Sequence, residues 1–395
     1  MQHDYISSKD DLRSFCDRAK SADSIYYDTE FVSEDTYRPE LCLIQVATSD
    51  GELAVIDPYQ AGSTAPFWDL ITSGDHQTVV HAGREEFRFC WHATSKRPSK
   101  LFDVQIGAGL IGLEYPASYG KLIAKLLGDR LPKGETRTNW RQRPLTDKQI
   151  EYALLDVHHL PALRDKITGE LEKRGRLPWF EEEITRWQDD LVEAESREKW
   201  RRVSGISGLA TKALVIVREL WRRREKEAEA TNRPPRRVLR DDLIVELARR
   251  GKSDLRAVKA IRGIERSGAK RHLADIADTI NVALKLPQEE WPRINKRSVP
   301  NQVTVLGQFL TTALTSICRE KKLAPSIVGT AQDVRDLVAF ELGYHPNGEE
   351  PPILARGWRA DVIGNSLRDL LHGKVAIRIK DPMSDYPLQF DSVDD

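Results

Sequence analysis

Short apolar runs of strand length dominate the first part of the chain, and helical patterns take over after them. The strand-like runs are separated by polar, Gly, Pro and Asp positions and cover residues 24–31, 41–48, 53–59 and 78–83. Helical patterns follow at residues 84–92, 104–113 and 144–160. Strands that give way to helices in this manner predict an α/β domain in which a mixed sheet is flanked by helices.

The helix expected over residues 144–160 carries its own start and stop signals. Thr146, followed three positions later by Gln149, has the pattern of a capping box, and Pro144 stands just outside it. Pro161 has no backbone N–H, so we expect it to kink or end the helix.

The second half of the chain has helical spacing. Residues 180–202 are highly charged and predict a helical connector. The next segment repeats apolar residues at three- and four-residue spacing, at Leu209, Ala213, Leu214, Val217, Leu220 and Trp221. After a linker-like stretch at 284–302, one helical face is expected to carry Val305, Phe309, Leu310, Ala313, Leu314 and Ile317. A hairpin is expected over 373–390.

Charge and cysteine content narrow the class of protein. Lys plus Arg and Asp plus Glu both number 61, so any surface that binds nucleic acid must be local. The four cysteines lack Cys-x-x-Cys spacing, which argues against a zinc site or a disulfide framework and favours a reduced setting. No apolar stretch approaches the length of a membrane span. We therefore expect a cytoplasmic protein with no membrane partner.

Two carboxylates, Asp28 and Glu30, stand inside the first strand-like run. Residues two apart on a strand point to the same face, so these acids project together and repel each other unless a cation lies between them. An edge strand with one solvated face is the alternative explanation. Further acids follow at Glu86, in the first turn of an expected helix, and at Asp156, one helical turn after Tyr152.

The order of these motifs resembles the ribonuclease D family of 3′→5′ exonucleases. The resemblance rests on YDTEFVSEDTYRPELCLIQVAT, VVHAGREEF, LFDVQIGAGLIG and RTNWRQRPLTDKQIEYALLDVHHL. It implies a ribonuclease H-like fold with an active site of four acids and a tyrosine. On the family's pattern, Asp28, Glu30, Glu86 and Asp156 would hold two divalent cations, Mg²⁺ or Mn²⁺, and Tyr152 would orient the attacking water.

The chemistry of phosphodiester hydrolysis explains these residue types. Two divalent cations roughly 4 Å apart stabilise the attacking and leaving oxygens together. Hard cations such as Mg²⁺ take oxygen ligands and keep several waters, so a few carboxylates suffice. The phenol of Tyr152 ordinarily has a pKa near 10, which argues for a positioning role over that of a general base.

Position 86 departs from the family's pattern, which has Asp where this chain has Glu86. Glu is one methylene longer, and misplacement by about 1 Å can cost about a hundredfold in rate.

Three functions stay open. The first is a metal-dependent 3′→5′ exoribonuclease that trims structured RNAs such as tRNA precursors and releases nucleoside 5′-monophosphates. The alternatives are a DNA 3′→5′ exonuclease and a catalytically weakened RNA-binding protein.

A basic loop precedes the helix that carries Tyr152 and Asp156. Cations that contact phosphates and an aromatic residue for stacking are what a single-stranded RNA end requires. The candidate RNA-binding residues are Lys133, Arg137, Trp140, Arg141 and Arg143. A solvated loop with a buried Trp is the alternative.

The helical block after the connector resembles the HRDC domain, which implies nucleic-acid binding without catalysis. The resemblance rests on LATKALVIVRELWRRREKEAEATNRPPRRVLRDDLIVELAR and DLRAVKAIRGI. The first of these segments contains a group of arginines that could be solvated or ion-paired: Arg222, Arg223, Arg224, Arg233, Arg236, Arg237 and Arg240. The last region resembles a C-terminal extension of ribonuclease D relatives. The expected domains are an exonuclease domain (1–175), a charged helical connector (176–203), an all-α HRDC bundle (204–287), a linker (288–302) and a mostly helical C-terminal domain (303–395) that is either HRDC-like or specific to the family.

Overall fold

The computed structural model describes the chain except for residues 133–137, 266–267, 293–299, 345–349 and 394–395. Its contacts divide it into two compact units. The first comprises residues 1–30, 43–192 and 298–395, and the second comprises residues 31–42 and 193–297.

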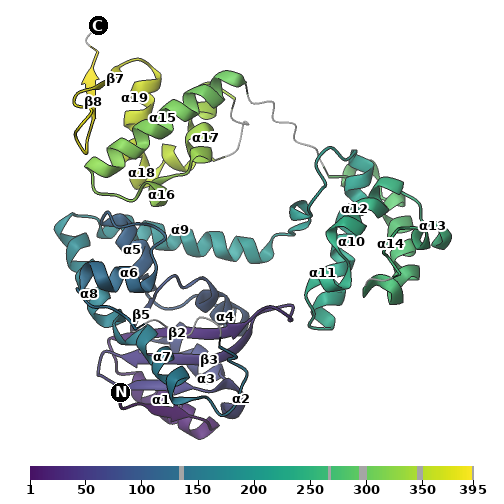
Figure 1. Ribbon diagram of the computed structural model, residues 1–395, viewed down its shortest axis with the longest axis horizontal. Helices are drawn as coiled ribbons and strands as arrows, with labels where there is room; N and C mark the ends of the chain where they lie inside the picture. Colours follow the sequence, from purple (N-terminus) through teal and green to yellow (C-terminus); the bar gives the residue numbers. More distant parts are fainter. Residues whose placement is uncertain (133–137, 266–267, 293–299, 345–349, 394–395) are drawn as a thin grey trace. The chain divides into compact units, whose positions relative to one another are not determined.

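A six-stranded mixed sheet forms the centre of the first unit (Figure 1). Its strands are β1 (Asp4–Ile6), β2 (Ser24–Val32), β3 (Glu40–Thr48), β4 (Leu53–Ile56), β5 (Gln77–Val80) and β6 (Phe102–Asp103). They lie in the order β1-β4-β3-β2-β5-β6. β3 and β4 are antiparallel, whereas β2 and β5, β5 and β6, and β1 and β4 are parallel. Each of the four predicted runs contains a strand, and the mixed α/β fold is confirmed.

Nine helices follow or flank these strands in the described part of the chain up to residue 196. They are α1 (Lys9–Ala19), α2 (Pro58–Ala61), α3 (Ala65–Ser73), α4 (Arg84–Thr94), α5 (Val104–Leu110), α6 (Tyr119–Leu126), α7 (Asp147–His158), α8 (Leu160–Lys173) and α9 (Leu177–Ser196). The capping box that starts α7 is confirmed, with both hydrogen bonds between Thr146 and Gln149 present. Pro161 lies in the first turn of α8, directly after α7 ends, as its missing N–H predicts.

The C-terminal part of the first unit is mostly helical. Its elements are α15 (Asn301–Glu320), α16 (Pro325–Val328), α17 (Ala331–Glu341), α18 (Gly357–Arg359), a π-helical segment (Ala360–Gly364), α19 (Asn365–Leu371) and the hairpin strands β7 (Val375–Ile379) and β8 (Leu388–Ser392). α15 lies beside α17 (Figure 1). The predicted buried face of α15 is wrong at two positions, because Val305 is 65% exposed and Phe309 is 52% exposed. The buried face instead runs through Val303, Gly307 and Leu310, and Gly307 on this face lies against Arg335 of α17.

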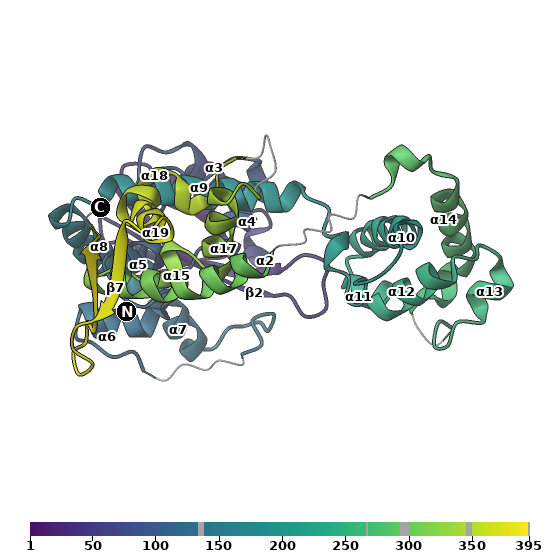
Figure 2. The same cartoon turned by 90° about the horizontal axis from the view of Figure 1, so that it is seen from above.

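The second unit is a helical bundle, as predicted. It contains α10 (Thr211–Ala230), α11 (Pro235–Val238), α12 (Asp241–Arg250), α13 (Leu255–Lys259) and α14 (Leu273–Lys285). α10 lies beside both α12 and α14 (Figure 2), and apolar side chains such as Val217, Ile244 and Ile280 fill the space between them. The unit therefore has a core of its own.

Several arginines of the bundle are ion-paired. Arg224 is buried and meets Asp241 at 2.6 Å, and Arg222 meets Glu198 at 2.6 Å. Arg223 lies 3.1 Å from Asp275. These pairs leave less of the basic segment available to a nucleic acid than its sequence suggests.

Candidate active site

Three carboxylates from two elements converge beside the second half of β2. Asp28 and Glu30 project from the same face of that strand, and Asp156 comes from α7. One carboxylate oxygen of each lies within 4.8 Å of the others. The paired acids of the first strand-like run therefore face a third acid from a distant segment.

The carboxyl groups of this cluster have raised pKa values because they are buried and close to one another. Burial, followed by the charges of Glu86, Asp156 and Glu30, raises the pKa of Asp28 well above its usual range. Burial, with the charges of Asp156 and Glu86, raises the pKa of Glu30 to about 8. Burial raises the pKa of Asp156 to about 7, against the lowering effect of a hydrogen bond from Tyr152. A cation among these oxygens would relieve the repulsion.

Glu86 stands beside this cluster in a separate arrangement. It lies in the first turn of α4, is 5% exposed, and accepts a 2.6 Å hydrogen bond from the hydroxyl of Thr29. Burial raises the pKa of Glu86 to about 7, and the bond from Thr29 opposes that rise. Glu86 is outside the group of three converging oxygens, although its charge acts on both Asp28 and Glu30.

A buried carboxylate fixes the turn that leads into α4. Asp103 accepts backbone hydrogen bonds from Ala82 at 3.1 Å and from Gly83 at 2.9 Å. Ala82 has a φ of 54°, a conformation that side-chain-bearing residues rarely adopt without such support. A Cβ on Gly83 would lie 2.3 Å from Val80, so the turn also requires a glycine at this point.

Tyr152 lies one helical turn before Asp156 and is hydrogen-bonded to it. Burial, with the charges of Asp156 and Glu30, raises the pKa of Tyr152 to about 12, so the phenol keeps its proton at neutral pH. Trp140 packs against the Tyr152 ring, with ring centroids 6.2 Å apart. The hydroxyl is therefore held as a donor at the edge of the acid cluster.

The chain is similar to known proteins over nearly its whole length. Residues 4–172 match the family described as 3′-5′ exonuclease, and residues 213–280 match the HRDC domain. The Ribonuclease D of Zymomonas mobilis is 33% identical over 387 residues, which cover 96% of each chain. The chain belongs to the ribonuclease D family. Its enzyme class is that of a 3′→5′ exoribonuclease.

Further ribonuclease D relatives cover nearly the whole chain. The Ribonuclease D of Gluconacetobacter diazotrophicus is 31% identical and covers 95% of this chain and 94% of its own length. The crystal structure of Escherichia coli RNase D, described as an exoribonuclease involved in structured RNA processing, superposes with a TM-score of 0.81 at 25% identity. That match covers 94% of this chain and 99% of the other.

Sequence reasoning missed two side chains that support these acids. Gln45, on β3, is fully buried and donates from Nε2 to Asp28 at 2.8 Å. Its Oε1 has no hydrogen-bond partner among the described residues. The available signal was a polar residue inside the apolar run LCLIQVAT. Thr29, which donates a hydrogen bond to Glu86, gave no such signal. A threonine between Asp28 and Glu30 is an ordinary residue for a strand.

The candidate RNA-binding residues have different surroundings. Lys133 and Arg137 lie outside the described residues. Trp140 is 8% exposed, which leaves little of its ring for stacking on a base. Arg143 contacts both carboxylate oxygens of Asp57, at 2.5 and 2.9 Å, so its charge is already offset within the protein.

Arg141 lies within the same loop and is half-buried. Its backbone N–H donates to the side chain of Asn139 at 3.1 Å, which shapes the loop just before Arg143.

None of the helices in the described part of the chain combines the length and hydropathy that a membrane span requires.

Proposed function

We propose that this ribonuclease D family member uses two divalent cations, Mg²⁺ or Mn²⁺, to trim the 3′ ends of structured RNAs such as tRNA precursors, releasing nucleoside 5′-monophosphates. The observation that carries the proposal is the convergence of Asp28, Glu30 and Asp156, whose oxygens lie within 4.8 Å of one another. The Escherichia coli relative, described as acting in structured RNA processing, supports the choice of substrate.

The residues present fit divalent cations. Three converging carboxylates with raised pKa values supply hard oxygen ligands that gain by meeting positive charge. The unpartnered Oε1 of Gln45 adds a buried acceptor next to Asp28. Asp28, Glu30 and Asp156 would hold the cations, with Glu86 acting from its place beside them. When bound, the cations supply the positive charge that offsets the attacking and leaving oxygens of the scissile phosphate.

The remaining side chains position the reactants. The Tyr152 hydroxyl keeps its proton at neutral pH and donates to Asp156, so it orients that carboxylate and can meet the attacking water. Gln45 orients Asp28 in the same way, because its Nε2 donates a hydrogen bond to one oxygen of that carboxylate. Trp140 limits the movement of the Tyr152 ring. This arrangement supplies positioning, with no side chain acting as a strong base.

The helical unit would bind the body of the RNA. Arg233 and Arg237 are exposed and lie close in sequence, so they are the arginines of its basic segment that we assign to phosphate contact. We also propose the domain boundaries expected from the sequence, which the HRDC match at 213–280 supports. We further propose a cytoplasmic location, because the four cysteines are all free and buried.

A hydrolysis assay tests the proposal. RNA and DNA strands labelled at the 3′ nucleotide are incubated with Mg²⁺, Mn²⁺ or EDTA, and the products are separated by size. We expect labelled mononucleotide from RNA only when a divalent ion is present, and none from Asp28→Ala. Glu151→Gln is the matched control, because it removes an exposed carboxylate from α7 next to Tyr152. Internal cleavage, activity in EDTA or a preference for DNA would contradict the proposal.

A further inference from the structure

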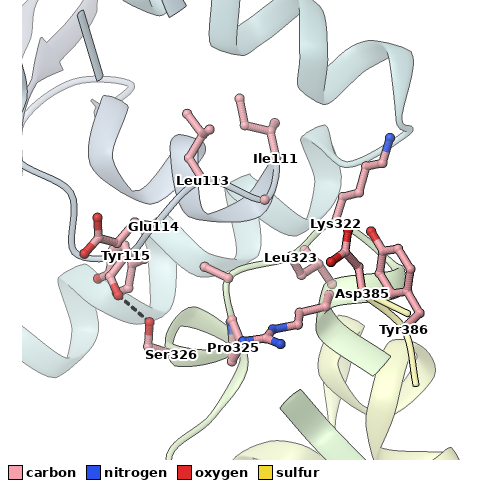
Figure 3. A pocket seen from close by; sticks show the side chains of 13 residues that line it. Ile111, Leu113, Glu114, Tyr115, Lys322, Leu323, Pro325, Ser326, Asp385 and Tyr386 are labelled. Carbon is pink, nitrogen blue, oxygen red and sulfur yellow. Dashed lines mark hydrogen bonds between the residues drawn. The ribbon is translucent and has the colours of Figure 1, made fainter. Parts of the chain in front are cut away.

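A groove lies within the first unit, between the segment that follows α5 and the C-terminal helices (Figure 3). One cavity of about 590 Å³ is lined on one side by residues 111–115 and on the other by the end of α15 and the loop that carries Tyr386. A second cavity of about 300 Å³ shares Arg319, Asp385 and Tyr386 with the first. The two cavities therefore form one continuous groove, and it shares no residue with the acid cluster.

The two walls of the groove are fixed to each other. Arg176 donates to the carbonyl of Leu110 at 2.6 Å and to those of Lys321 and Lys322 at 2.5 and 2.9 Å. The backbone N–H of Ala324 donates to the carbonyl of Gly109 at 2.9 Å. These bonds join α5 to the end of α15 and also neutralise the negative end of the α15 dipole. The groove is therefore preformed and does not repel an anion through that helix end.

The α15 side of the groove carries hydroxyls and positive charge. Thr312, Ser316 and Arg319 recur at helical spacing along one face of α15, and Lys322 lies two residues beyond the end of that helix. Among the described residues, the side chains of Arg319 and Lys322 have no hydrogen-bond or ion-pair partner. Two unpaired cations on a rigid wall suit phosphate groups.

An aromatic ring and two acids complete the lining. Tyr386 is 49% exposed, and Figure 3 shows it with Lys322 and Asp385 at one end of the first cavity, whereas Glu114 and Tyr115 lie at the other. Glu114 is already paired with Lys121 at 2.7 Å. Asp385 offers acceptor oxygens, which ribose hydroxyls can meet as donors.

We propose that this groove binds ribonucleotide units, separately from the acid cluster. Arg319 and Lys322 contact phosphates, Tyr386 stacks on a base, and Asp385 accepts hydrogen bonds from ribose hydroxyls. The proposal rests on the proposed action on RNA, and it assigns the C-terminal part of the chain a direct contact with the substrate. The same chemistry could come from an RNA strand or from a released nucleoside 5′-monophosphate, and the experiment separates these sources.

The test measures binding in EDTA with the full chain. A fluorescein-labelled oligoadenylate RNA is titrated with the protein at several salt concentrations, and 5′-AMP binding is measured by calorimetry. For Arg319→Ala with Lys322→Ala, we expect the slope of log affinity against log salt to fall by about 1.4, from about 0.7 for each phosphate contact. Tyr386→Ala should weaken RNA binding about five-fold or more, and Tyr386→Phe should restore it.

Lys321→Ala with Lys380→Ala is the matched control, because both lysines are exposed and lie outside the lining while the change in charge is the same. Loss of RNA binding in the groove variant alone supports a site for the RNA strand, and a parallel loss of 5′-AMP binding supports one for the released nucleotide. Equal binding by the groove and control variants, for both probes, would overturn the proposal. Because both measurements report binding and not cleavage, this result is independent of whether the acid cluster hydrolyses RNA.

Discussion

Removing one charge from the acid cluster should stabilise the metal-free protein. Glu30 has a pKa of about 8 in the folded chain against an ordinary value of 4.5. The folded state therefore holds this proton more tightly than the unfolded state. The resulting stability is fully present below pH 4.5 and is lost as the pH rises to about 8.

The size of this effect follows from the shift in pKa. At 1.36 kcal/mol for each unit of pH, the loss between pH 5 and pH 8 is about 4 kcal/mol. Glu30→Gln removes this loss, although its amide needs a partner and costs about 1–3 kcal/mol if it finds none. We therefore expect a gain in stability of about 1–3 kcal/mol at pH 8. At pH 5 the carboxyl of the unmodified protein is already protonated, so only the amide cost remains and we expect a loss of about 1–3 kcal/mol.

Differential scanning calorimetry in EDTA measures the change. The relevant transition is the one that Mn²⁺ shifts in the unmodified protein. The midpoint temperature of this transition should rise by about 2–4 °C for each kcal/mol of stability gained. Added Mn²⁺ should then stabilise the unmodified protein more than Glu30→Gln. Glu151→Gln serves as the control, since it changes an exposed carboxylate on α7. A loss of stability in Glu30→Gln at pH 8, or the same gain at both pH values, would refute the reasoning.

Three further substitutions have defined outcomes. Gln45→Ala removes a donor to the acid cluster and should weaken Mn²⁺ binding, measured by calorimetry, about ten-fold; unchanged affinity would exclude that role. Thr29→Val leaves Glu86 buried without its hydrogen bond, so unfolding by urea should become easier by about 1–3 kcal/mol, and a neutral effect would contradict this. Glu183→Ala leaves the buried Arg359 without its 2.6 Å partner and should cost about 3–5 kcal/mol in the same assay, unlike a solvent-exposed pair.

The regular elements around the site could be predicted because their signals are local. The capping box at Thr146 and the alternation through Asp28 and Glu30 depend on residues a few positions apart. The three-residue strand β1 gave too short a pattern to be recognised, and its pairing with β4 comes from a segment about fifty residues away. Strand existence was thus predictable where the apolar run was long enough.

The contacts that adjust the site could not be predicted, because they join segments far apart in the chain. The bonds from Gln45 to Asp28 and from Thr29 to Glu86 depend on how β3 and α4 pack against β2. The pair between Arg143 and Asp57 likewise offsets the charge of a cation that sequence alone assigned to RNA. Charge and polarity identify candidates, whereas the fold decides which of them already have partners.

The most direct test of the account is anomalous diffraction from crystals of the protein soaked in Mn²⁺. Two manganese peaks within ligand distance of the carboxylates of Asp28, Glu30 and Asp156, with the second peak on the side of Glu86, are the predicted result. Crystals whose manganese lies elsewhere, with those carboxylates left without an ion at saturating Mn²⁺, would contradict the account.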